Sequence, residues 1–308
     1  MPPKPEAQAF LDVFASLELP PLESMPAEMQ REIFGAENPD GPPPPPIASV
    51  ADRTIPGPAA DIPVRVYRPS DATGLPLVVF VHGGGWVIGD LDSHDYICRA
   101  IANAADAVVM SVDYRLAPEN PFPASYDDSI AGLKWAVENA AELGADPSRV
   151  AVAGDSAGGN LAAAMGVWAR DNNVDLAAQV LIYPATNLAA PGTDSYFANA
   201  DGYLLTRGWM DWFIDQYLPG DTDRSDPAAS PALADSLADV APAIVLTAEF
   251  DPLRDDGKNY ADALGAAGVP VTYTNYDGQI HGFATQIGAM EDAQRAVDQI
   301  AEFLTATW

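Results

Sequence analysis

The amino-acid sequence predicts an α/β fold, in which eight strands form a mostly parallel sheet that is covered by helices on both faces. Eight apolar runs rich in β-branched residues recur along the chain, each bounded by turn residues. From the third run onward they alternate with segments of helical periodicity, as parallel strands joined by crossover helices do. Ligands bind beyond the carboxyl ends of the strands in such sheets, so functional residues are expected there.

The strands are expected at residues 47–55, 61–68, 76–82, 107–112, 149–154, 178–183, 243–249 and 270–276. The helices that alternate with them are expected at residues 93–105, 123–142, 157–171, 255–268 and 287–306.

Two segments interrupt this alternation. Residues 1–46 contain two helical stretches, and residues 187–240 separate the sixth strand from the seventh. We interpret both as parts of one discontinuous helical cap over the carboxyl edge of the sheet. The domain that carries the sheet then consists of residues 47–186 and 241–308.

The charge balance restricts the partners. The chain has 44 acidic and 15 basic residues and a formal net charge of −29. Such a surface repels polyanions, so we expect neither nucleic-acid binding nor membrane insertion, and an uncharged or cationic substrate is favoured. An acidic soluble surface explains this composition, and adaptation to a saline habitat is the alternative.

The few cysteines and histidines argue against a protein that is stabilised by disulfides or that binds a metal. Cys98 is the only cysteine, so no intrachain disulfide can form. One cysteine and three histidines show no metal-ligand spacing, and we expect no metal and no cofactor. The N-terminal residues lack the features of a signal peptide, and no apolar run is long enough to span a membrane. These features predict a soluble, cytoplasmic protein.

The segment GDSAG, residues 154–158, lies between a predicted strand and a predicted helix. This is the strand-turn-helix context of a nucleophile elbow, in which a sharp turn exposes the serine at the edge of the sheet. Ser156 is therefore the candidate nucleophile.

A serine hydroxyl needs a base within hydrogen-bonding reach, and the base needs an acid that orients it. His281 is the only histidine that follows Ser156, as the order serine, acid, histidine requires. Asp251 directly follows the seventh strand and is the predicted acid. Asp255, which opens the next helix, is the alternative.

Three glycines, Gly83 to Gly85, follow the third strand and His82. Backbone N–H groups can stabilise the oxyanion that forms when an acyl carbonyl is attacked. We assign this role to the N–H groups of Gly83, Gly84 and Ala157. His82 is interpreted as a scaffold residue, and His94 receives no role.

The substrate pocket is predicted partly from the second insert. Trp209 and Phe213 lie on one face of a predicted helix in that insert, where they either pack on the core or line a pocket for an apolar group. Trp86, Asp155 and Tyr183 complete the predicted pocket.

Five motifs occur in a fixed order: HGGGW (82–86), YRLAPE (114–119), GDSAGGN (154–160), DPLRDD (251–256) and HGF (281–283). In these motifs the chain resembles the hormone-sensitive-lipase family of α/β-hydrolases, the bacterial family IV esterases. The resemblance implies an α/β-hydrolase fold with an eight-stranded sheet and an N-terminal cap. It also implies the triad and the oxyanion donors assigned above.

The resemblance further implies a cofactor-independent serine carboxylesterase, which hydrolyses short- to medium-chain acyl esters through an acyl-enzyme on Ser156. It implies a homodimer through the last strand, residues 270–276. The alternatives with the same triad are an amidase, a carbamate hydrolase and an acyltransferase. A non-catalytic ligand receptor on this scaffold would lack the catalytic histidine, and His281 argues against it.

Overall fold

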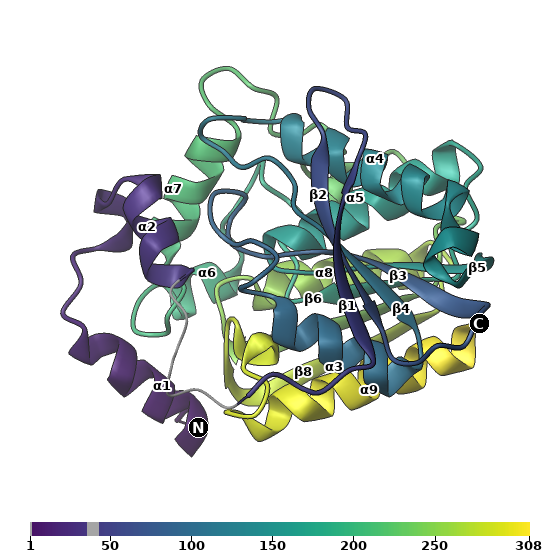
Figure 1. The fold of residues 1–308 in the computed structure, drawn as a ribbon. Coiled ribbons are helices and arrows are strands. Elements are labelled where there is room, and N and C mark those ends of the chain that lie inside the picture. The colour runs from purple at the N-terminus through teal and green to yellow at the C-terminus, as the bar shows by residue number, and fades with distance from the viewer. Residues whose placement is uncertain (1, 36–42) are drawn as a thin grey trace.

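The computed structural model describes residues 2–35 and 43–308; residues 1 and 36–42, which belong to the first predicted cap segment, lie outside it. The strands form one sheet in the order β1-β2-β4-β3-β5-β6-β7-β8 (Figure 1). β2 runs antiparallel to both of its neighbours, and the strands from β4 to β8 are parallel. The predicted eight-stranded, mostly parallel sheet is confirmed. The strands are β1 Ser49–Ile55, β2 Ile62–Arg68, β3 Leu75–Val81, β4 Val108–Val112, β5 Ala145–Asp155, β6 Ala178–Ile182, β7 Ala243–Phe250 and β8 Val271–Ile280.

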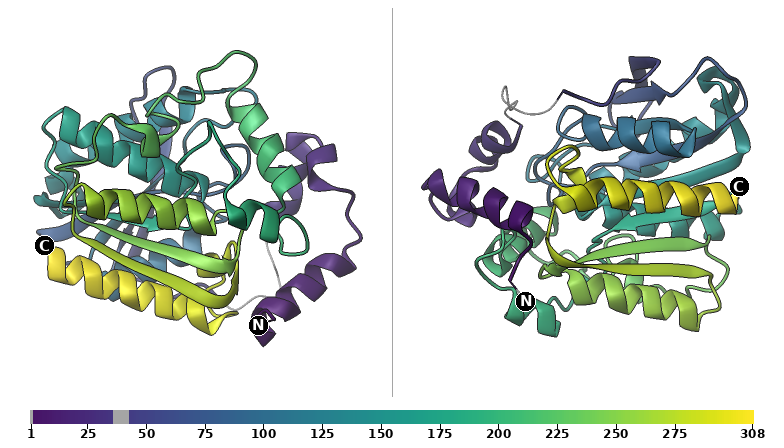
Figure 2. Two further views of the ribbon diagram at one scale, coloured as in Figure 1. Left: turned by 180° about the vertical axis from the view of Figure 1, so that it is seen from behind. Right: turned by 90° about the horizontal axis from the view of Figure 1, so that it is seen from below.

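Helices cover the sheet on both faces. On one face α4 (Ala124–Glu138), α5 (Ala157–Asp171) and α8 (Arg254–Ala266) enclose one apolar cluster with the sheet. On the other face α3 (Asp95–Ala105) and α9 (Glu291–Thr307) lie side by side over a second cluster (Figures 1 and 2). This double cover explains why every residue of β3 and β4 is buried, and why these strands are apolar runs without alternation.

β8 is longer than predicted. The strand was expected to end at residue 276, but it continues through Asp277 and ends at Ile280, directly before His281. A register shift between Ala248 and Phe250 of β7 lets the pairing of the two strands extend to Ile280. The extension therefore carries the chain to the carboxyl edge of the sheet, where His281 is needed.

The two predicted cap segments contact each other. The first contains α1 (Pro5–Ser16), the short helix η1 (Leu22–Ser24) and α2 (Ala27–Phe34), and the second contains α6 (Asp194–Ala198), α7 (Arg207–Tyr217) and η3 (Pro231–Leu233). α2 lies beside α7 in Figure 1, and the ring of Phe34 stacks on that of Trp209 with centroids 5.2 Å apart. The remaining short helices are η2 (Ala140–Leu143) and η4 (Phe283–Thr285).

The N-terminal segment also reaches back to the sheet. The backbone N–H of Lys4 donates to the carbonyl of Gly278 in β8 at 2.8 Å, and its ammonium group pairs with Asp292 of α9. Among the described residues, no helix combines the length and the apolar character needed to cross a membrane.

Candidate active site

A strained turn presents Ser156. β5 ends at Asp155 and α5 begins at Ala157, so the serine is the single residue between strand and helix. Its φ of 55° and ψ of −117° lie in a region that residues other than glycine rarely occupy. The turn also requires Gly158, because a Cβ there would lie 2.0 Å from the carbonyl oxygen of Val81. The sequence G-x-S-x-G thus folds into the sharp turn predicted for it.

Ser156, His281 and Asp251 form a continuous hydrogen-bonded chain. The Oγ of Ser156 lies 2.9 Å from Nε2 of His281, and Nδ1 of His281 lies 2.7 Å from Oδ2 of Asp251. Asp251 is fully buried, and its second oxygen accepts the N–H of Leu253 at 2.8 Å. The carboxylate therefore has a donor on each oxygen, and one of them is the imidazole.

Asp255, the alternative acid, has other partners. Its Oδ2 accepts the backbone N–H of Ser195 at 2.8 Å, and its Oδ1 accepts the guanidinium of Arg254 at 2.8 Å. Ser195 belongs to α6 in the second cap segment. Asp255 therefore joins that segment to the start of α8 and does not contact the imidazole of His281.

His82 is a buried scaffold residue. Its Nδ1 lies 2.8 Å from the carbonyl oxygen of Gly83, and its ring stacks on Tyr114 with centroids 4.2 Å apart. The hydroxyl of Tyr114 donates to the carbonyl of His82 at 2.8 Å. The first residue of the YRLAPE motif therefore holds the residue that directly precedes the glycine loop. Burial lowers the pKa of His82 to about 4 and keeps its ring neutral near pH 7.

The assignment of Gly83 as an oxyanion donor is wrong. The N–H of Gly83 donates to Oδ1 of Asp155 at 2.9 Å and is not available to a substrate. A Cβ on Gly83 would lie 2.4 Å from Oδ2 of the same carboxylate. The first glycine of the run is therefore required by the close approach of Asp155.

The next two glycines keep their N–H groups free. Within residues 2–35 and 43–308, the N–H groups of Gly84, Gly85 and Ala157 donate no hydrogen bond. Gly84 and Gly85 have φ values of 115° and 58°, and a Cβ on Gly85 would lie 2.3 Å from the ring of Phe213. Gly84, Gly85 and Ala157 are thus the candidate oxyanion donors.

A cavity of about 220 Å³ opens above Ser156. Asp155, Trp209 and Phe213 line it, as predicted, together with His281. Five more apolar side chains line it and come from the two predicted cap segments: Phe10, Phe34, Leu204, Leu205 and Met210.

Two predicted pocket residues do not line this cavity. Trp86 is fully buried, and its ring stacks on Tyr217 of α7 with centroids 4.6 Å apart. Tyr183 is also fully buried, and its ring centroid lies 4.6 Å from that of His281. Each residue packs behind the wall of the cavity and supports a part of it.

His94, Phe10 and Phe34 are among the residues of the site that the sequence interpretation missed, as is Gly85 in the glycine loop. His94 is buried, lines the cavity, and has its Nε2 atom 3.1 Å from Oδ1 of Asp155. Nothing local distinguishes it from a surface histidine, because its partner is remote in sequence. Phe10 and Phe34 lie in the predicted cap helices, whose apolar residues were a signal for the pocket wall.

A family model described as alpha/beta hydrolase fold matches residues 78–285. The chain belongs to this family. It is 53% identical over 229 residues to carboxylesterase NlhH of Mycobacterium tuberculosis, an alignment that covers 72% of this chain and 71% of NlhH. It is 50% identical over 241 residues to carboxylic ester hydrolase LipN of the same organism, covering 76% of this chain and 64% of LipN.

Among solved structures, the fold is similar to that of ester-hydrolase EH1AB1 from the metagenome of Lake Arreo. The TM-score is 0.94, the identity 42%, and 99% of each chain is covered. The predicted hormone-sensitive-lipase family, the α/β-hydrolase fold and the enzyme class of carboxylic ester hydrolase are confirmed. This hydrolase contains, among its described residues, no cluster of side chains suited to hold a metal ion.

Proposed function

We propose that this hydrolase cleaves short- to medium-chain acyl esters through an acyl-enzyme on Ser156, with no cofactor. The observation that carries the proposal is the chain of hydrogen bonds from Ser156 through His281 to Asp251 at the base of an apolar cavity. Ser156 is placed to act as the nucleophile, His281 as the base and Asp251 as the acid that orients the base.

In the first half of the reaction, Oγ of Ser156 attacks the ester carbonyl carbon while Nε2 of His281 takes the hydroxyl proton. Asp251 stabilises the imidazolium that results. The carbonyl oxygen becomes an oxyanion, which accepts hydrogen bonds from the free N–H groups of Gly84, Gly85 and Ala157. When the tetrahedral intermediate collapses, the C–O bond to the alcohol breaks and His281 returns the proton to the leaving oxygen.

Water completes the cycle. It attacks the acyl carbon of the ester on Ser156 while His281 takes one of its protons, and the same N–H groups hold the second oxyanion. The bond to Oγ then breaks, the proton returns to Ser156, and the carboxylic acid leaves.

The size of the cavity supports short to medium acyl chains. Its volume of about 220 Å³ is below the roughly 300–1,000 Å³ of pockets for drug-sized ligands. Side chains from residues 1–46 and 187–240 close it, and we propose that these two segments act as one cap that limits the chain length.

A panel of p-nitrophenyl esters from acetate to palmitate, with matched anilides, tests the function. We expect rates that fall as the acyl chain grows, and no turnover of the anilides. Ser156→Ala should remove the hydrolysis of every ester and keep the fold, as measured by circular dichroism. Full activity of this variant would refute the mechanism, and faster cleavage of the anilides would make the enzyme an amidase.

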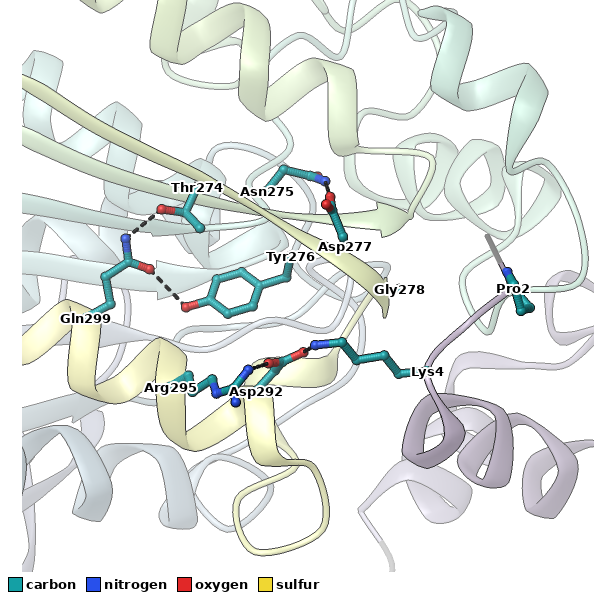
Figure 3. A pocket seen from close by; sticks show the side chains of 10 residues that line it. All are labelled: Pro2, Lys4, Thr274, Asn275, Tyr276, Asp277, Gly278, Asp292, Arg295 and Gln299. Carbon is teal, nitrogen blue, oxygen red and sulfur yellow. Dashed lines mark hydrogen bonds and ion pairs between the residues drawn. The ribbon is translucent and has the colours of Figure 1, made fainter.

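We also infer that two copies of the chain pair through the outer edge of β8. Among the described strands, β8 is the last of the sheet and pairs only with β7, and exposed edges of this kind need cover. A hollow of about 520 Å³ adjoins this edge, lined by Thr274 to Gly278, α9 and Lys4 (Figure 3). Sedimentation equilibrium should give the mass of a dimer, and a monomer at every protein concentration would contradict the inference.

A further inference from the structure

His94 is a buried titratable group beside the active site that the reaction steps above do not use. It precedes the first residue of α3 and is 7% exposed. Its Nε2 atom lies 3.1 Å from Oδ1 of Asp155 and 3.2 Å from the backbone nitrogen of Gly83. Its Nδ1 atom lies 3.0 Å from Oγ of Ser93. Both ring nitrogens therefore have a polar neighbour.

The acceptor at Asp155 determines that Nε2 of His94 carries a proton. Burial by itself would raise the pKa of Asp155, but the neighbouring His94 and the N–H of Gly83 lower it below its usual value. The group is thus a carboxylate, which only accepts hydrogen bonds. His94 therefore donates from Nε2 to Asp155, and its Nδ1 faces the hydroxyl of Ser93.

One carboxylate joins the two halves of the catalytic centre. Asp155 is the last residue of β5 and is bonded covalently to Ser156, while its Oδ1 holds the N–H of Gly83 at 2.9 Å. Gly83 begins the loop whose next two N–H groups are free. The position of these groups relative to Ser156 thus depends on the orientation of the Asp155 side chain.

We propose that His94 is a positioning residue for the oxyanion hole. Its Nε2–H holds Oδ1 of Asp155, this oxygen holds Gly83, and the N–H groups of Gly84 and Gly85 are thereby kept aimed at the reacting carbonyl. The benefit of such donors depends on their being in place before the charge develops. The inference rests on the proposed esterase mechanism.

Two substitutions test the roles of the two ring nitrogens of His94 separately. In His94→Gln the side-chain amide nitrogen stands near the position of Nε2 and can still donate to Asp155. In His94→Asn the amide is one carbon shorter and stands near Nδ1, so the donor to Asp155 is lost while a polar group still faces Ser93. Both variants introduce a carboxamide group, and their side chains differ only in length.

We expect His94→Asn to lower kcat for p-nitrophenyl acetate by about 10- to 100-fold, with KM changed by less than about 3-fold, as for misplaced transition-state donors. His94→Gln should keep kcat within about 5-fold of the wild type. If His94 served packing alone, His94→Asn would lower the melting temperature but would not lower kcat selectively while leaving KM nearly unchanged.

Binding of an aryl trifluoromethyl ketone gives a second readout. Oγ of Ser156 adds to its carbonyl carbon, the proton passes to His281, and the carbonyl oxygen becomes an oxyanion in the hole. His94→Asn should weaken this adduct by about the factor lost in kcat/KM, whereas the affinity for the corresponding secondary alcohol, which forms no oxyanion, should stay unchanged.

Unchanged kcat and unchanged adduct affinity in His94→Asn would overturn the proposal, and so would a His94→Gln variant as impaired as His94→Asn. Should His94→Asn not fold, His94→Met, which has similar length and no donor, replaces it in the comparison. A wild-type enzyme that cleaves no ester would refute the proposed function, whereas an active wild type with unaffected variants would refute only the role of His94.

Discussion

The indole N–H of Trp209 donates to Oε1 of Gln30 at 2.9 Å, although the two residues are 179 positions apart. The amide nitrogen of Gln30 donates to the carbonyls of Leu22 at 2.7 Å and Met25 at 3.1 Å. This fully buried glutamine thereby joins η1, α2 and α7. Because Trp209 lines the cavity, the contact between the two cap segments also fixes a wall of the active site.

Gln30→Leu should alter the selectivity for chain length and lower the stability. The substitution leaves one indole N–H and two carbonyls without their partner, at a cost of about 1–3 kcal/mol. With Trp209 released, KM for p-nitrophenyl hexanoate should rise more than KM for the acetate. Steady-state kinetics and urea unfolding measure both effects. Gln8→Leu, an exposed glutamine on α1, is the control and should change neither.

Phe213→Ala should move the preferred acyl chain toward greater length. The ring of Phe213 packs against Gly85 and lines the cavity, so its removal extends the apolar space beside the candidate oxyanion donors. Relative rates on the p-nitrophenyl ester series should show a longer optimum than the wild type. Trp212→Ala is the matched control, because its ring contacts that of Phe213 from outside the cavity. An unchanged optimum in Phe213→Ala would exclude this residue as the limit on chain length.

Asp251→Asn and Asp255→Asn should differ strongly. The first replaces the acceptor of the Nδ1 proton of His281, and loss of the acid in such a triad lowers kcat by about 10⁴-fold. The second weakens the attachment of α6 to α8 and should leave kcat within about 10-fold while lowering the melting temperature. A loss of activity confined to Asp255→Asn would mean that the acid has been misidentified.

Local patterns explain what the sequence could predict. The central strands β3, β4, β6 and β7 are short apolar runs, and Ser156 stands between a strand and a helix in a motif of five residues. His281 followed from the order of the triad along the chain. These inferences depend only on residues that are neighbours in the sequence or on the order of residues along the chain. The strand ends were therefore predicted to within a few residues.

The details of the glycine loop depended on contacts that the sequence does not reveal. The sequence does not distinguish Gly83 from Gly84 and Gly85. The structure does, because the carboxylate of Asp155, 72 positions away, accepts the N–H of Gly83. Trp86 was expected to line the pocket, yet its stacking on Tyr217 buries it. Such choices depend on tertiary packing between segments that lie far apart in the chain.

Asp256→Asn should produce a difference in stability that depends on pH. Burial raises the pKa of Asp256 to about 6, although the N–H and the hydroxyl of Thr186 both donate to its carboxyl group at 2.8 Å. Between the unfolded pKa near 3.8 and the folded value, the native protein keeps a proton that the unfolded chain releases, so the contribution of Asp256 to stability falls as the pH rises. The free energy of unfolding lost through Asp256→Asn should therefore shrink by about 2–3 kcal/mol from about pH 4 to about pH 7. Urea unfolding across this range measures it, with the exposed Asp262→Asn on the same helix as the control, and a loss that is constant with pH would show that Asp256 ionises normally.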